Sequence, residues 1–159
     1  MAKTRLTPEQ ALQRIQRYCV YQDRHHQEVR SKLIEFGVYG DALENIIAEL
    51  IEEGFLNEER YARSFARGKF RVKHWGRIRI VQELKARHIS AYSIKQGLKE
   101  IDETDYRSTL QAVMEKKWEA LANEEPYARK SKTAQYVISR GFESELVWEF
   151  INAWIKGTD

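Results

Sequence analysis

One pattern of apolar residues occurs three times in this chain, about fifty residues apart, around the anchor residues Gly37, His88 and Gly141. Apolar side chains recur four residues before each anchor and one, six, ten and thirteen residues after it. They are Leu33, Val38, Leu43, Ile47 and Leu50; Leu84, Ile89, Ile94, Leu98 and Ile101; and Val137, Phe142, Val147, Ile151 and Trp154. A unit of about fifty residues buries little apolar surface alone. We therefore predict three copies of one supersecondary unit that stabilise one another in a tandem array.

Each copy also carries the start and stop signals of three helices. The residues predicted to cap helix N-termini are Thr7, Asp41, Asn57 and Ser90. Gln10 and Glu44 complete capping boxes with the first two. Each anchor is typical of a residue just past a helix end with positive φ, a conformation that glycine adopts freely and histidine tolerates.

No segment shows the period-two alternation of a strand. The predicted fold class is therefore all-α: three tandem three-helix repeats in an elongated, curved array. The predicted repeats are residues 1–56, 57–103 and 104–159.

The composition indicates a soluble protein of a reducing compartment. No apolar run approaches the roughly 20 residues that span a membrane, and the N-terminus has no apolar secretory core. The single cysteine, Cys19, excludes an intrachain disulfide. We expect a cytoplasmic monomer with no membrane partner.

The positive charge of this chain is concentrated in its middle. The net charge is only +3. Between Arg60 and His88, however, ten Lys or Arg residues accompany a single acid, Glu83, and the rest of the chain is net acidic. This asymmetry indicates a polyanionic partner more strongly than the overall charge does.

A helical wheel of residues 58–73 places four arginines within roughly 80° of one another. They are Arg60, Arg63, Arg67 and Arg71; Tyr61, Phe65 and Val72 lie near the opposite, packing side. We predict an exposed cationic row, which binds phosphate or carboxylate groups. The full candidate binding set is Arg60, Arg63, Arg67, Arg71, Lys73, Arg77, Arg79, Lys85 and Arg87. Trp75 is either a stacking platform for bases or a packing residue between units.

No catalytic pattern stands out in the sequence. It has no glycine-rich phosphate loop, no HExxH, no CxxC and no GxSxG. His25 and His26 are adjacent, so they cannot share one helix face as metal ligands. We expect a protein that is not an enzyme, with no cofactor and no metal.

Residues 54–89 resemble the RecX family of recombination regulators. The family pattern has a Gly-apolar-Leu lead-in, an Arg-aromatic-Ala segment, and Gly-x-x-Arg-Ile-x-x-Glu-Leu followed by Gly-Ile. The matched positions are Gly54, Leu56, Arg60, Tyr61, Ala62, Phe65, Gly76, Arg79, Ile80, Glu83, Leu84 and Ile89, while His88 replaces the expected glycine.

The resemblance implies a negative modulator of the RecA recombinase. Such a protein binds in the groove of the RecA filament on single-stranded DNA and inhibits strand exchange, ATP turnover and filament extension. The expected partners are the RecA filament and single-stranded DNA, with duplex DNA bound weakly if at all. Two alternatives stay open at this point: a direct DNA-binding helical regulator, and a protein-only helical scaffold.

Overall fold

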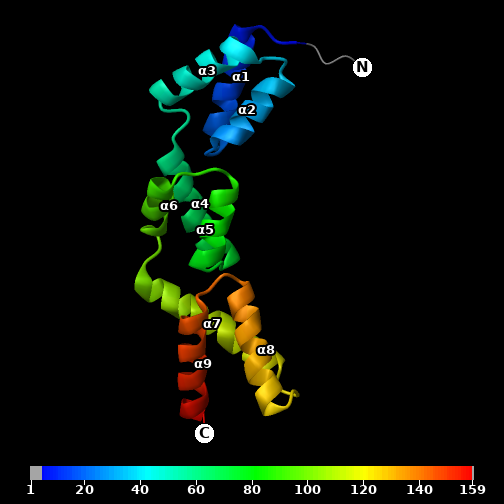
Figure 1. Ribbon diagram of the computed structural model, residues 1–159, viewed down its shortest axis with the longest axis vertical. Helices are drawn as coiled ribbons and strands as arrows, with labels where there is room; N and C mark the ends of the chain where they lie inside the picture. Colours follow the sequence, from blue (N-terminus) through cyan, green and yellow to red (C-terminus); the bar gives the residue numbers. More distant parts are fainter. Residues whose placement is uncertain (1–4, 159) are drawn as a thin grey trace.

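The computed structural model describes residues 5–158, which form nine helices and no strand. The helices are α1 (Pro8–Tyr21), α2 (His26–Glu35), α3 (Gly40–Glu52), α4 (Glu58–Lys73), α5 (Arg77–Ala86), α6 (Ala91–Leu98), α7 (Glu103–Ala120), α8 (Pro126–Ser139) and α9 (Ser144–Thr158). They form three groups of three, which follow one another along an elongated column (Figure 1). We call α1–α3 repeat 1, α4–α6 repeat 2 and α7–α9 repeat 3. The all-α repeat prediction is confirmed. Residues 1–4, on which the expected lack of a secretory segment partly rests, lie outside the described residues.

The three anchor residues end the second helix of each repeat, as predicted. Gly37, His88 and Gly141 have φ angles of 87°, 60° and 104°. In repeats 1 and 2, the residue after the anchor donates its N–H to the carbonyl of the residue four before the anchor, at 3.0 and 3.1 Å. These bonds are typical of a helix end closed by a left-handed residue. His88 therefore takes the place of a glycine because histidine tolerates positive φ.

Most of the predicted helix caps are confirmed. Thr7 forms a complete capping box with Gln10, and Asn57 and Ser90 accept backbone N–H groups of α4 and α6. The predicted box of Asp41 and Glu44 is wrong, because α3 begins at Gly40 and has no side-chain cap.

Glu44 instead accepts two hydrogen bonds from Arg30 on α2, at 2.5 and 3.1 Å. A bidentate guanidinium is a stronger partner for a carboxylate than a single backbone N–H. The positive φ of Gly40, 63°, supplies the turn that precedes α3.

The buried apolar residues form two cores rather than three. One lies within repeat 1, around Ile15, Leu33 and Leu50. The other runs continuously through repeats 2 and 3. Tyr106 joins its two halves, because its ring lies 5.8 Å from that of Phe70 and 5.2 Å from that of Phe142. Repeats 2 and 3 therefore share one hydrophobic core, whereas repeat 1 has its own.

The joint between repeats 2 and 3 depends on two glycines in close contact. A Cβ atom on Gly76 would lie 2.2 Å from the carbonyl carbon of Gly141, closer than any real contact. Gly76 donates its N–H to the Arg140 carbonyl at 2.9 Å, and Ile78 donates to the Gly141 carbonyl at 2.9 Å. The backbones of α5 and of the loop before α9 can therefore pair directly only because both positions lack a side chain.

Arg77, Tyr106 and Glu143 add a polar clamp to this joint. The Arg77 guanidinium lies 3.8 Å from the centre of the Tyr106 ring and 3.4 Å from the Glu143 carboxylate. The Tyr106 hydroxyl donates to Glu143 and accepts the backbone N–H of Arg77. Burial, aided by the hydrogen bond to Glu143, raises the pKa of the Tyr106 phenol. The phenol is therefore a fixed donor in this clamp.

The joint between repeats 1 and 2 is more polar. Arg60 at the start of α4 pairs with Asp23 before α2, with 2.7 Å between Nε and Oδ1. The His25 ring packs edge-on against Tyr61, with 5.3 Å between centroids. His25 Nδ1 is buried and has no hydrogen-bond partner among the described residues. A proton on Nδ1 would therefore have no acceptor among the described residues, although Nε2 lies 3.9 Å from the Glu28 carboxylate.

We predict that this joint loosens in acid. Burial lowers the pKa of His25, and Arg87, His26 and His88 lower it further, while Glu28 opposes the shift. A histidine whose pKa is lower when folded contributes its full stability above its unfolded pKa of about 6.5, and the contribution is lost as pH falls below that value. The thermal midpoint should therefore fall between about pH 6.5 and 5 in the wild type.

His25→Phe should flatten this dependence, while His74→Asn controls for the loss of an imidazole at an exposed left-handed position that asparagine tolerates. Thermal melts followed by circular dichroism across that pH range make the comparison. Equal slopes in the wild type and in His25→Phe would contradict the assignment.

Candidate partner-binding surface

The orientation of α4 decides which basic side chains are free to meet a partner. Ala62, Ala66 and Phe70 form its buried stripe, and α6 packs closely against it. Gly97 permits this contact, since a Cβ there would lie 2.7 Å from the Ala62 carbonyl oxygen. The prediction that Val72 packs is wrong: its side chain is 74% exposed. The docking of α6 decides which side of α4 is buried. This side differs from the one predicted from the positions of the four arginines, which would have included Val72.

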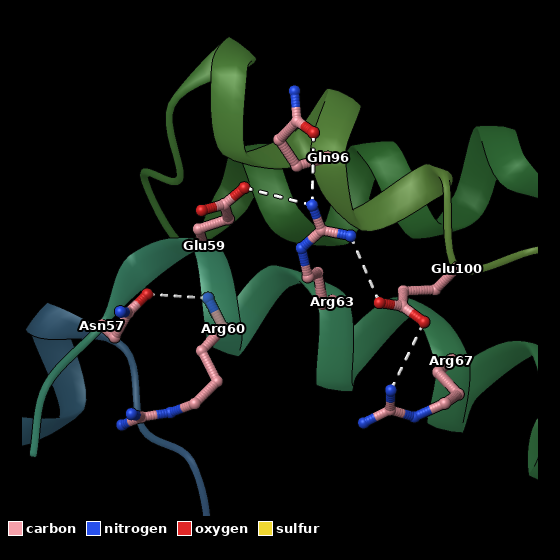
Figure 2. Close-up of polar contacts among 7 residues, drawn as sticks. All are labelled: Asn57, Glu59, Arg60, Arg63, Arg67, Gln96 and Glu100. Carbon is pink, nitrogen blue, oxygen red and sulfur yellow. Dashed lines mark hydrogen bonds and ion pairs between the residues drawn. The ribbon is translucent and has the colours of Figure 1, made fainter. Parts of the chain in front are cut away.

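Arg63 and Arg67 lie beside α6 and share one carboxylate (Figure 2). The two oxygens of Glu100 accept from Arg63 Nη1 at 3.2 Å and from Arg67 Nη1 at 3.4 Å. Arg63 Nη2 also donates to Glu59 at 3.2 Å and to Gln96 at 3.3 Å. These two arginines therefore brace α4 against the end of α6, although both remain partly exposed.

Arg60 has a structural role. Besides its bond to Asp23, its terminal nitrogens donate to the carbonyls of Gly54 and Phe55 at 2.9 and 3.1 Å. Two of these bonds hold the guanidinium against the segment that follows α3, and the bond to Asp23 ties it to the loop before α2. The close-up shows the Arg60 side chain pointing away from Arg63 and Arg67 (Figure 2). This motif residue fixes the connection between repeats 1 and 2.

Two further members of the candidate set are also paired within the chain. Arg77 belongs to the clamp at the joint of repeats 2 and 3 and also pairs with Glu103. Arg87 donates to the carboxylate and the carbonyl of Glu83 at 2.9 and 2.8 Å. This hydrogen bond holds the pKa of Glu83 below its usual range. Ion pairs within the chain therefore involve Arg60, Arg63 and Arg67 of the predicted row, and also Arg77 and Arg87 of the wider candidate set.

Trp75 lies partly buried against the joint core of repeats 2 and 3. The Arg79 guanidinium covers its ring at 4.1 Å, and the Lys69 ammonium lies 5.0 Å from the ring centre. Its ring also meets Phe65 edge-on, with 6.3 Å between centroids. The packing role of Trp75 is favoured by this geometry, because base stacking on the covered face would require Arg79 to move.

Three members of the candidate set have neither an ion pair nor an aromatic contact among the described residues. Arg71, Lys73 and Lys85 are exposed, and their side chains have no ion pair among the described residues. Arg71 and Lys73 lie in the last turn of α4. Their positive charges are therefore available to a partner without first breaking an internal contact.

The sequence analysis missed a second basic region, which lies in repeat 3. The segment 126–140 contains four Lys or Arg residues and no acid, and Lys116 and Lys117 precede it on α7. Arg140 of this segment donates to the Lys73 carbonyl and so meets the end of α4. The absence of acids from residues 126–140 is the sequence signal that indicates this region. It is weaker than the signal of the middle repeat, which has ten Lys or Arg residues between Arg60 and His88.

The part of the chain that the structure describes has neither a metal-binding cluster nor a membrane-spanning helix. Among residues 5–158, no cluster of three or more His, Cys, Asp or Glu side chains could hold a metal ion. Within the same span, every helix is too short or too polar to cross a bilayer.

Comparison with known proteins gives a consistent result. Residues 57–98 match the family model described as the second three-helix domain of RecX, and residues 104–151 match that of the third. The regulatory protein RecX of Pseudomonas entomophila (strain L48) is 30% identical over 125 residues, 79% of this chain and 79% of that protein. The regulatory protein RecX of Prosthecochloris aestuarii is 28% identical over 137 residues, 86% of this chain and 88% of its own.

Two solved structures have the same fold. The crystal structure of RecX from Lactobacillus salivarius superposes with a TM-score of 0.82 at 20% identity, covering 92% of this chain and 95% of the other. A second crystal structure, of a regulatory protein RecX, has a TM-score of 0.82 at 23% identity and covers 92% and 73%. At these identities the superpositions establish the fold alone.

Proposed function

The chain belongs to the RecX family of regulatory proteins, and from this membership we propose that it is a negative modulator of the RecA recombinase. On this proposal it binds in the groove of the RecA filament on single-stranded DNA. It inhibits strand exchange, ATP turnover and filament extension by occupying that groove as a cytoplasmic monomer. It acts by binding and carries out no chemistry of its own.

One observation carries the proposal beyond family membership: exposed, unpaired cations lie on an elongated helical column. Stacked helical repeats provide long surfaces that suit extended partners. A filament of protein on DNA is such a partner, and its phosphates and carboxylates complement Arg71, Lys73 and Lys85. The paired arginines define the shape of this surface, whereas the unpaired cations supply its charge.

Co-sedimentation with RecA, with and without single-stranded DNA, tests this proposal, together with a strand-exchange assay. We expect the protein to sediment with the RecA–DNA filament and to inhibit strand exchange. Tight binding to one duplex sequence without RecA would favour the direct DNA-binding regulator. Binding to RecA that is indifferent to nucleic acid would favour the protein-only scaffold. Strand exchange at the uninhibited rate would contradict the proposal.

Glu100→Gln tests whether Arg63 and Arg67 also meet the partner. The substitution removes the negative charge that both arginines share. Arg67 then has no ion pair among the described residues, while Arg63 keeps its bonds to Glu59 and Gln96. If these arginines contact an anionic filament, the concentration for half-inhibition should fall by about threefold, because an opposing charge is lost at the interface. Titrating inhibition of strand exchange measures this concentration.

Glu149→Gln is the matched control for Glu100→Gln. It removes one negative charge from an exposed position on α9 that has no ion pair among the described residues. An equal change in both variants would indicate a general effect of net charge. No change in Glu100→Gln would show that Arg63 and Arg67 serve only to brace α4 against α6.

A further inference from the structure

Two adjoining cavities lie along α7, where repeat 3 meets the end of α4. The first has a volume of about 290 Å³ and is lined by His74, Lys116, Lys117, Tyr136 and Arg140 among others. The second, of about 330 Å³, adds Ser108 and Thr109. Both include His74, Val113 and Lys116, so they form one groove over α7.

The described side chains that line this groove include basic groups but no carboxylate. Two lysines, an arginine and a histidine contribute to them, and among the described residues no carboxylate lines either cavity. Neither Lys116 nor Lys117 has an ion pair within residues 5–158. Lys117 places its ammonium 4.6 Å from the centre of the Tyr136 ring. An anion entering the groove therefore meets cations that internal acids have not neutralised.

The groove continues toward the unpaired cations of α4. Arg140 donates to the carbonyl of Lys73, the last residue of α4, which holds the guanidinium at the wall of the cavity. His74 follows directly in a left-handed conformation, with φ of 55°, and ends α4 at the groove. Arg71 and Lys73 thus lie on the same end of α4 that borders the groove.

We propose that this groove holds the sugar-phosphate backbone of single-stranded DNA. Each volume is close to the lower limit of small-molecule sites, about 300 Å³, which suits successive nucleotides but not a helix of a partner protein. The Ser108 and Thr109 hydroxyls add neutral donors of the kind that bind phosphate oxygens. The Tyr136 ring is 38% exposed, and because the Lys117 ammonium covers one face, a base would stack on the other face, beside the cations, a combination typical of single-strand binding.

An acidic peptide would use the cations but not the aromatic ring, so the lining favours nucleic acid. The inference rests on the proposed function for its partner, because the filament groove is where this protein would meet single-stranded DNA. It adds repeat 3 to the contact surface, which the sequence had confined to repeat 2.

Fluorescence anisotropy with labelled oligothymidylate tests the groove without RecA. Lys116→Gln/Lys117→Gln should weaken binding by roughly tenfold at low salt. It should also reduce the slope of log affinity against log salt by about 1.4, since each lost phosphate contact on a single strand contributes about 0.7.

Lys95→Gln/Lys99→Gln, on α6 and at its C-cap, removes the same charge from exposed positions that do not line the groove. This control should stay within about twofold of the wild type. Equal affinities of the two double variants would overturn the inference.

Nuclear magnetic resonance gives a second readout that requires no substitution. The chain has only four histidines, and His74 is the one that lines the groove. Its ring resonances should shift on titration with oligothymidylate, while those of His25 in the joint of repeats 1 and 2 should not. His74 resonances that do not shift at saturating oligothymidylate would overturn the inference. Resonances that shift with oligoglutamate but not with oligothymidylate would also overturn it.

The two proposals can fail separately. Suppose that the wild type inhibits RecA strand exchange but the groove variant binds oligothymidylate as tightly as the wild type does. This result contradicts the proposed DNA site in the groove and leaves the proposed function standing. A wild type that leaves strand exchange unaffected contradicts the proposed function; weakened oligothymidylate binding by the groove variant would still support the groove.

Discussion

Gly76→Ala is expected to lower the free energy of unfolding by about 3–5 kcal/mol. The new methyl group would lie 2.2–2.3 Å from the backbone atoms of Gly141 and Phe142, which are not flexible side-chain ends that can move aside. Relieving the clash separates two backbone segments that are joined by the hydrogen bonds from Gly76 and Ile78 to the carbonyls of Arg140 and Gly141, both at 2.9 Å. It also opens the continuous core of repeats 2 and 3.

Tryptophan fluorescence during urea unfolding isolates this effect. All four tryptophans, Trp75, Trp118, Trp148 and Trp154, belong to repeats 2 and 3, so their emission reports on the shared core alone. Far-UV circular dichroism reports on all nine helices that the structure describes. In Gly76→Ala the fluorescence transition should shift to lower urea, while the helical signal of repeat 1, which has its own core, should persist to higher urea.

Gly68→Ala is the matched control for this substitution. Gly68 lies inside α4, and an added Cβ would meet nothing within 4 Å. Alanine is favoured over glycine in a helix interior by about 0.8–1.0 kcal/mol, so this variant should be slightly more stable than the wild type. An unchanged fluorescence midpoint in Gly76→Ala would contradict the proposed glycine contact between the repeats.

Arg71→Glu/Lys73→Glu is expected to raise the concentration for half-inhibition of RecA strand exchange by about tenfold or more. Both side chains are exposed and unpaired among the described residues, so their reversal breaks no internal ion pair. The change replaces attraction to an anionic filament with repulsion at the end of α4. Titration of the strand-exchange reaction measures the effect, and raising the salt should narrow it by screening.

Lys95→Glu/Lys99→Glu carries the same change in charge at exposed positions, one in the last turn of α6 and one at its C-cap, and serves as the control. Because cations favour a helix C-terminus, reversal in the last turn of α4 should also cost a few tenths to 1 kcal/mol per residue. A thermal melt separates this loss from the loss of binding. Equal inhibition by the two double variants would show that the end of α4 does not meet the filament.

Much of the fold could be predicted because its signals are local. A residue past a helix end needs a backbone that tolerates positive φ, so Gly37, His88 and Gly141 mark the repeat without reference to distant contacts. The caps at Thr7, Asn57 and Ser90 depend only on neighbours three residues away. The cap predicted at Asp41 failed because α3 begins before it, at Gly40, and Glu44 pairs with Arg30 on another helix.

The candidate site was harder to predict because charges pair through space. Arg60 pairs with Asp23 and Arg63 with Glu100, and each pair is separated by 37 residues in the sequence. Counting charges along residues 60–88 could not include either acid. The cationic groove over α7 was missed for a related reason, since His74 comes from repeat 2 and Arg140 from repeat 3.

The repeat, its helical class and the position of each helix end follow from the order of the residues, because each depends on periodicity and on backbone preferences within a few positions. The number of cores, the close contact of Gly76 with Gly141, and the set of unpaired cations do not. They follow from how the repeats dock, because burial and ion pairing are set by distances between segments far apart in the chain. An arginine stabilises the fold where the docking of the repeats and helices brings a carboxylate close to it, and it is available to bind a partner where no carboxylate is close.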